Sequence, residues 1–180
     1  MNNELEAFID HLDTAREHVL GILEGLTEQD LRRPVLPSGW SCLELVRHLT
    51  IDVERFWLRG VIAGEAEATE LFKAGATAHW HVPDSMSADE ALAAYRSETR
   101  RANTALTAVA NAHAHAHAEH PLTQEPAVWP VEIWPTWRLP DLRHILLHVI
   151  TEVSCHAGHL DAAREMIDGK TWLGKDPFAA

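Results

Sequence analysis

The chain has 180 residues, 46% hydrophobic and 23% charged, a composition typical of one globular domain spanning residues 1–180. Its formal net charge of −12 argues against binding to phosphate backbones or anionic lipids, so we expect neither a nucleic-acid nor a membrane partner. The two cysteines, Cys42 and Cys155, are too few for a disulfide framework, and the first residues lack an export-signal pattern, so we expect a cytoplasmic protein.

The first two predicted elements are amphipathic helices. Apolar residues recur every three or four positions from Leu5, and Gly25 with the TEQD turn closes this helix. The second helix begins at Ser41, where Ser41-x-x-Glu44 forms a capping box, and runs towards Gly64. The short segment between them predicts antiparallel neighbours.

Two further helices follow. The third begins at another capping box, Ser87-x-x-Glu90, and continues past Val109. The fourth begins at Pro140–Asp141 and ends before Gly169, a residue type that favours a helix C-terminus. No stretch alternates as a strand would. The sequence therefore predicts an all-α four-helix bundle.

Two long segments, residues 64–86 and 111–139, connect these helices. Long connections in compact domains tend to be functional or disordered. The second contains Trp129, Trp134 and Trp137, and tryptophans are poor material for a disordered linker. We expect them to pack over one end of the bundle and form part of a pocket wall. Filling the edge of the core is an equal alternative.

The fourth helix carries polar residues on its apolar stripe. Glu152 and His156 follow Val149 at the spacing of the residues that face the interior, and they lie one turn apart. A buried carboxylate is costly unless its charge is compensated, and a divalent metal would compensate it. His48, at the edge of the second helix's stripe, is the natural third ligand. Three protein ligands leave one position open, as in catalytic sites.

Other readings stay open at this point. Glu152 and His156 could form a simple hydrogen-bonded pair, and a His148–Glu152–His156 ladder on one helix is a second option. His159 and Asp161 are candidates for supporting the ligands or lining the pocket mouth.

Three further features, outside the candidate metal ligands, are interpreted mainly as structural rather than functional. The HAHAHAEH tract of residues 113–120 could chelate metal loosely or be a fraying helix end. His79 and His81, which flank Trp80, could reach the metal from the first long connection, but a surface role is favoured. Cys155 reads as a buried apolar residue, and Cys42 as an inert thiol despite an N-terminal position that would lower its pKa.

Two segments resemble a known family. SGWSCLELVRHLTIDVERFW (residues 38–57) and LLHVITEVSCHAGHLDAAREMIDG (residues 146–169) are similar to the DinB-like superfamily. The closer resemblance is to its actinobacterial branch, which includes mycothiol-dependent maleylpyruvate isomerase.

The resemblance implies a four-helix bundle that holds a divalent metal, zinc or else nickel, through His48, Glu152 and His156. It also implies a thiol-dependent transferase or isomerase that uses a low-molecular-weight thiol such as mycothiol as co-substrate with a small electrophile, and it makes a homodimer a candidate assembly. The alternatives are a metal-dependent hydrolase and a non-catalytic, metal-stabilised binding protein.

Overall fold

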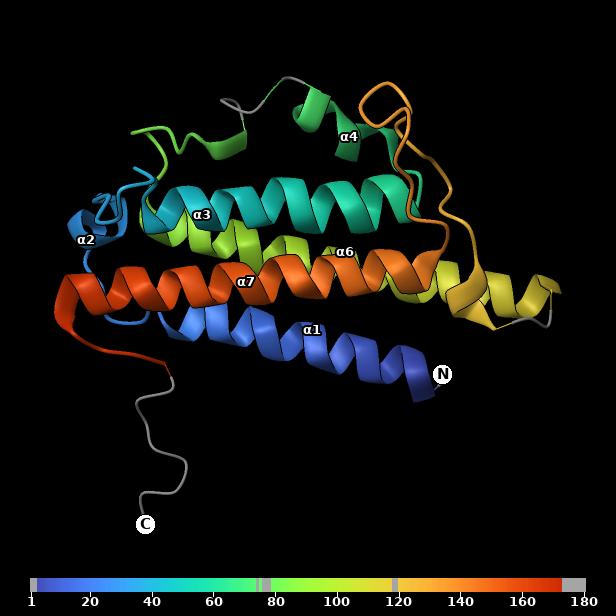
Figure 1. The fold of residues 1–180 in the computed structure, drawn as a ribbon, viewed down its shortest axis with the longest axis horizontal. Helices are drawn as coiled ribbons and strands as arrows, with labels where there is room; N and C mark the ends of the chain where they lie inside the picture. Colours follow the sequence, from blue (N-terminus) through green and yellow to red (C-terminus); the bar gives the residue numbers. More distant parts are fainter. Residues whose placement is uncertain (1–2, 74, 76–78, 118–119, 173–180) are drawn as a thin grey trace, which may run out of the picture.

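The structure is a computed structural model that describes residues 3–73, 75, 79–117 and 120–172 (Figure 1). Its long elements are α1 (Asn3–Gly21), α3 (Cys42–His48) continued by the π-helix η1 (Leu49–Ile62), α6 (Ala88–His117) and α7 (Leu142–Asp168). Its short ones are α2 (Glu28–Arg32), α4 (Ala66–Lys73) and the 3-10 turn η2 (Pro121–Thr123). These described ranges contain no strand, which confirms the predicted all-α bundle.

The long elements run alongside one another as a bundle, with α1 against α7 and α6 against η1 (Figure 1). The two pairs join where α7 contacts η1. Fully buried side chains from each long element meet in the core, among them Leu12, Leu45, Phe56, Tyr95 and Val153. Burial of this apolar surface supplies the main driving force for folding.

Capping residues fix the helix ends that orient the bundle. The Ser41 hydroxyl accepts a hydrogen bond from the Glu44 amide, and the Glu44 carboxylate accepts one from the Ser41 amide at 2.8 Å. The Asp141 carboxylate accepts from the His144 amide at the start of α7, and Gly169 closes that helix with a φ of 76°. The predicted starts of the second and fourth helices are confirmed, as is the end of the fourth.

The connections differ from the prediction. The regular part of the first helix ends at Gly21, and the expected TEQD turn is instead the N-cap and first turn of α2, because the Thr27 hydroxyl accepts a hydrogen bond from the Asp30 amide. The segment of residues 64–86 contains α4, and α6 runs on to His117. The side chains of residues 113–119 lie outside the described part, so within the HAHAHAEH tract only the side chain of His120 is described, and it accepts a hydrogen bond from the Leu122 amide.

The second helix changes type at His48. It continues as η1, whose i→i+5 hydrogen bonds widen the helix, a feature that is often found at functional sites. Most of η1 is buried because α4 covers the side that α6 and α7 leave open. Its charged residues are therefore paired: Arg16 of α1 donates to Glu54 at 2.8 Å, and Arg59 donates to Glu98 of α6 at 2.7 Å.

None of the helices described here is both long and apolar enough to cross a bilayer.

Candidate metal centre

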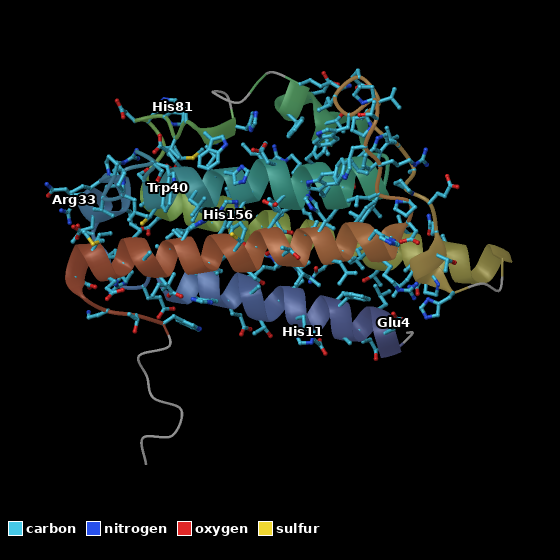
Figure 2. All side chains as sticks on the ribbon, viewed as in Figure 1. Glu4, His11, Arg33, Trp40, His81 and His156 are labelled. Atoms are coloured by element: carbon cyan, nitrogen blue, oxygen red, sulfur yellow. The ribbon has the colours of Figure 1, made fainter. Side chains whose placement is uncertain are left out.

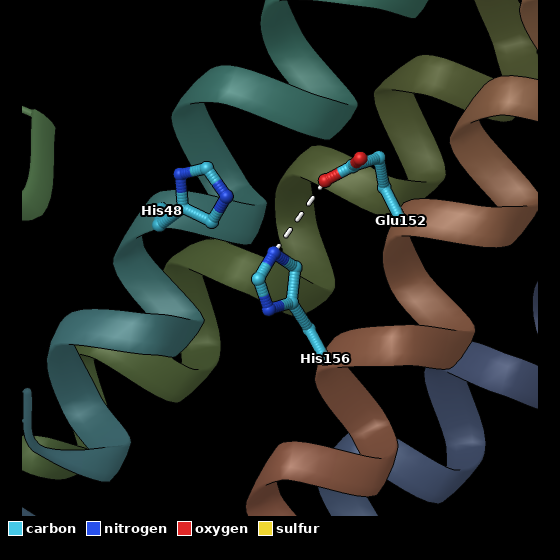
Figure 3. Close-up of side chains that lie close together, drawn as sticks. All are labelled: His48, Glu152 and His156. Atoms are coloured by element: carbon cyan, nitrogen blue, oxygen red, sulfur yellow. Dashed lines mark ion pairs between the residues drawn. The ribbon is translucent and has the colours of Figure 1, made fainter. Parts of the chain in front are cut away.

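Three side chains from two helices meet in the space between α3 and α7 (Figure 3). His48 is the last residue of α3, while Glu152 and His156 lie one turn apart on α7. One donor atom from each lies within 4.8 Å of the other two. Imidazole nitrogens and a carboxylate oxygen are ligands that zinc accepts, so this donor set fits a divalent ion.

The spacing between Glu152 and His156 also fits a shared ion. Nε2 of His156 lies 3.5 Å from Oε2 of Glu152, as the dashed line in Figure 3 marks. That is longer than the usual 2.7–3.2 Å of an N–H···O hydrogen bond. Two ligands that each lie about 2.1 Å from one tetrahedral ion are about 3.4 Å apart. The atoms are therefore spaced more like ligands than like a close hydrogen-bonded pair.

Electrostatics keep Glu152 ionised near neutral pH. The nearby imidazole of His156 lowers the pKa of its carboxyl group, burial opposes that shift, and the fields of His148 and His48 lower the pKa further. An ionised carboxylate is the form that binds a cation.

The expectation that Glu152 is buried in the core is wrong. Its side chain is 37% exposed and that of His156 is 16% exposed. After Val149, the buried line of α7 runs through Val153 and Ala157, each one position away from Glu152 and His156, which the sequence reading placed on that line. The case for a metal therefore rests on the convergence of donor atoms and not on the cost of burying a carboxylate.

His148 takes part in a different set of contacts. Among the described residues, the donor group that converges within 4.8 Å includes His48 and not His148. The His148 imidazole instead meets the edge of Trp57 at 4.8 Å between ring centroids and lies 5.9 Å from Trp137. Burial among these rings lowers its pKa, while Glu152 raises it by a smaller amount, so the imidazole is neutral at pH 7.

The other two residues predicted to support the site lie in different places. His159 is next to a triad member, with its Nδ1 3.2 Å from Nδ1 of His156. In Figure 2, His156 projects from α7 towards α3, and Trp40 lies on that same side, 6.1 Å from His159 between ring centroids. Asp161 does not reach the triad, because its carboxylate pairs with Nε2 of His18 on α1 at 2.8 Å.

Three residues surround His48 that the sequence did not assign to it. Asp52 Oδ2 lies 2.6 Å from His48 Nδ1, and His79 Nδ1 lies 2.6 Å from the same oxygen. Trp80 stacks on the His48 ring, with centroids 4.3 Å apart. The surface interpretation is wrong for His79, which is 6% exposed, and right for His81, which is exposed. The four-residue spacing from His48 to Asp52 was the available signal.

Cys42 is an inert thiol as expected, but not with the lowered pKa that its position suggested, and the buried interpretation of Cys155 is wrong. Cys42 is buried, and burial raises the pKa of its thiol to about 11, which outweighs the lowering expected from its place at a helix N-terminus. Cys155 is exposed, because it lies on the side of α7 opposite Val153 and Ala157.

The tryptophans of the second connection pack over one end of η1, as expected. Trp134 stacks on Trp57 at 5.2 Å with an interplanar angle of 12°, and Trp129 and Trp137 both contact Trp134. Through Trp57 and Trp137 this aromatic cluster reaches His148, one turn before Glu152. It therefore forms an apolar surface beside the triad.

Comparison with known proteins gives one positive result. A family model described as mycothiol-S-transferase matches residues 7–169, which include the whole triad and both long connections. No curated protein and no solved structure showed a match.

Proposed function

Because the chain belongs to the mycothiol-S-transferase family, we propose that it is a metal-dependent transferase that joins the sulfur of a mycothiol-type thiol to a small electrophile. The observation that carries this proposal is the convergence of His48, Glu152 and His156 within 4.8 Å. Family membership supports the thiol, and the donor set supports a divalent ion. We propose zinc first and nickel as the alternative.

The three ligands have separate tasks. His48 and His156 would bind the ion through imidazole nitrogens, and Glu152 would add one negative charge. A divalent ion held by them would supply Lewis acidity that lowers the pKa of a bound thiol and keeps it as a thiolate near neutral pH. The protein itself positions the two reactants, and holding reactants together can lower a barrier by up to about 7–11 kcal/mol.

The electrophile belongs, in this proposal, on the aromatic side of the site. Trp137 is 42% exposed and borders His148, so an apolar molecule that packs there displaces water from a large ring. In the transfer, a bond forms between the thiol sulfur and the electrophilic carbon. The leaving group departs with its bonding electron pair, and the thiol proton is released to water.

A thiol panel tests this proposal. Protein loaded with zinc or nickel is incubated with 1-chloro-2,4-dinitrobenzene and, in turn, mycothiol, bacillithiol, glutathione and cysteine, and the products are identified by mass spectrometry. We expect the thioether and chloride, formed fastest with mycothiol, and loss of the acceleration in His156→Ala. His11→Ala, which changes an exposed histidine of α1, is the matched control and should react like the wild type.

Two other outcomes would point to other functions. Hydrolysis of an activated ester by the loaded protein, without thiol and without conjugation, would favour a metal-dependent hydrolase. No thiol binding and no turnover of either kind would favour a non-catalytic, metal-stabilised binding protein.

A further inference from the structure

Asp52 lies between two histidines that come from different parts of the chain. Its Oδ2 atom is 2.6 Å from Nδ1 of His48, four residues earlier on the same helix, and 2.6 Å from Nδ1 of His79, in the segment between α4 and α6. Asp52 and His79 are each only 6% exposed. The contact is therefore interior and is shielded from competing water.

The chemistry of the three groups fixes where the protons are. An ionised carboxylate can only accept hydrogen bonds, so both Nδ1 atoms must carry the hydrogen and donate it. A neutral imidazole with its hydrogen on Nδ1 has its lone pair on Nε2. His48 is thus held in the form that offers Nε2 as a ligand. Figure 3 agrees: one ring nitrogen of His48 faces Glu152 and His156, and the other faces away.

The charge of Asp52 also needs compensation. Oδ1 of Asp52 is buried with no hydrogen-bond partner among the described residues, so imidazoles are the donors seen on this carboxylate. The Arg47 guanidinium also lies within the electrostatic field of Asp52. A cation on the far nitrogen of His48 would add positive charge one ring away, and metal-bound histidines commonly donate their other nitrogen to a carboxylate.

We propose that Asp52 and His79 are positioning residues of the metal centre: Asp52 orients His48 with Nε2 towards the triad, and His79 holds Asp52 in place. This inference rests on the metal-binding part of the proposed function. It gives the connection after α4 a defined task, because His79 carries its neighbour Trp80 onto the face of His48.

Four substitutions test the proposal. Asp52→Asn keeps the shape and one acceptor oxygen but removes the charge. His79→Leu removes the donor, and His79→Gln restores a donor of similar reach. The matched control is Asp161→Asn, which changes another carboxylate that pairs with a histidine across two helices, 2.8 Å from His18 Nε2.

The wild type is examined without metal, and the wild type and each variant are then examined with Co²⁺. The imidazole ¹⁵N shifts of the metal-free wild type should show His48 and His79 with hydrogen on Nδ1. Competition with a chromophoric chelator gives the Co²⁺ affinity, and the visible spectrum of bound Co²⁺ reports its coordination. Asp52→Asn should lower the affinity about 10–100-fold and alter the spectrum. His79→Leu should lower it less, His79→Gln should recover most of that loss, and Asp161→Asn should match the wild type.

The inference and the proposed function fail in different ways. Hydrogen on Nε2 of His48 in the metal-free protein, or wild-type Co²⁺ affinity and spectrum in Asp52→Asn, would overturn the positioning role while leaving metal binding intact. A wild-type protein that binds no Co²⁺ would overturn the metal centre itself, and the positioning role with it.

Discussion

The rings of His48 and Trp80 lie face to face, with centroids 4.3 Å apart and planes 16° from parallel. Such aromatic contacts contribute about 0.5–1.5 kcal/mol beyond the area they bury. Trp80 thereby covers one face of the His48 ring, a candidate ligand. The rings of His48 and His156 meet edge to face, with centroids 4.9 Å apart. The indole is thus in contact with the ring of a candidate metal ligand.

Binding of paramagnetic Co²⁺ or Ni²⁺ at the triad should quench the fluorescence of Trp80, because the indole touches a ligand ring. Trp80→Phe should therefore show a smaller fractional quench than the wild type. Trp172→Phe is the control, since Trp172 stacks on His18, which is outside the triad, at 5.2 Å and 17°. Equal quenching in Trp80→Phe and the wild type would place the ion elsewhere.

Single substitutions of the triad should separate ligands from neighbours. We expect about one divalent ion per chain in the wild type, loss of the ion in His48→Ala and His156→Ala, and partial retention with a much lower transfer rate in Glu152→Gln. Elemental analysis measures the metal content, with His11→Ala as the control. Loss of metal in His148→Ala together with full retention in His48→Ala would instead support a ladder on α7.

Chelation should lower the melting temperature without unfolding the protein, because the bundle has its own apolar core. An ion present at about 100 times its Kd stabilises the native state by about 2.7 kcal/mol. For a chain of this size, that corresponds to a change of roughly 5–11 °C in Tm. Circular dichroism before and after treatment with a chelator measures both quantities. A random-coil spectrum after chelation would mean that the metal is structural.

The two cysteines should differ sharply in reactivity. The Cys42 thiol is buried, with a pKa raised to about 11, so at about pH 8 it is almost entirely protonated. Cys155 is exposed. Iodoacetamide should therefore modify Cys155 in the native protein and reach Cys42 only after unfolding, as peptide mapping would show. Equal labelling of both thiols in the native state would contradict the packing around Cys42.

His148 should make stability depend on pH. Burial lowers its pKa below the ordinary 6.5, so the folded state binds a proton less readily than the unfolded state. The free energy of unfolding is therefore undiminished by His148 above pH 6.5, and it declines as the pH falls from 6.5 towards the lowered pKa.

Urea unfolding of the metal-free protein between about pH 7.5 and about pH 5 measures this effect. In His148→Gln the decline in unfolding free energy should be smaller. An NMR titration that places the pKa of His148 above 6.5 would reverse the expected sign.

Local sequence signals predicted the helix boundaries that the structure confirms. The Ser41–Glu44 capping box and Gly169 each form hydrogen bonds or a turn within a few residues along the chain. They therefore predict helix ends without knowledge of the fold. The proximity of Glu152 and His156 could be predicted for the same reason, because residues four positions apart on one helix lie on the same side, one turn from each other. Choosing His48 as the third member needed the stripe on a second helix and the family resemblance.

Relationships between distant segments were decided by the tertiary structure. His79 is 27 positions from Asp52 and reads as a surface residue until the connection after α4 folds over η1 and buries both. Cys155 reads as buried because helical periodicity gives the angle between neighbours but not which side of α7 meets α1 and η1. The sequence by itself thus determined the four long helices and the three candidate metal ligands. Packing decided which faces are covered, because burial depends on contacts made across the whole chain.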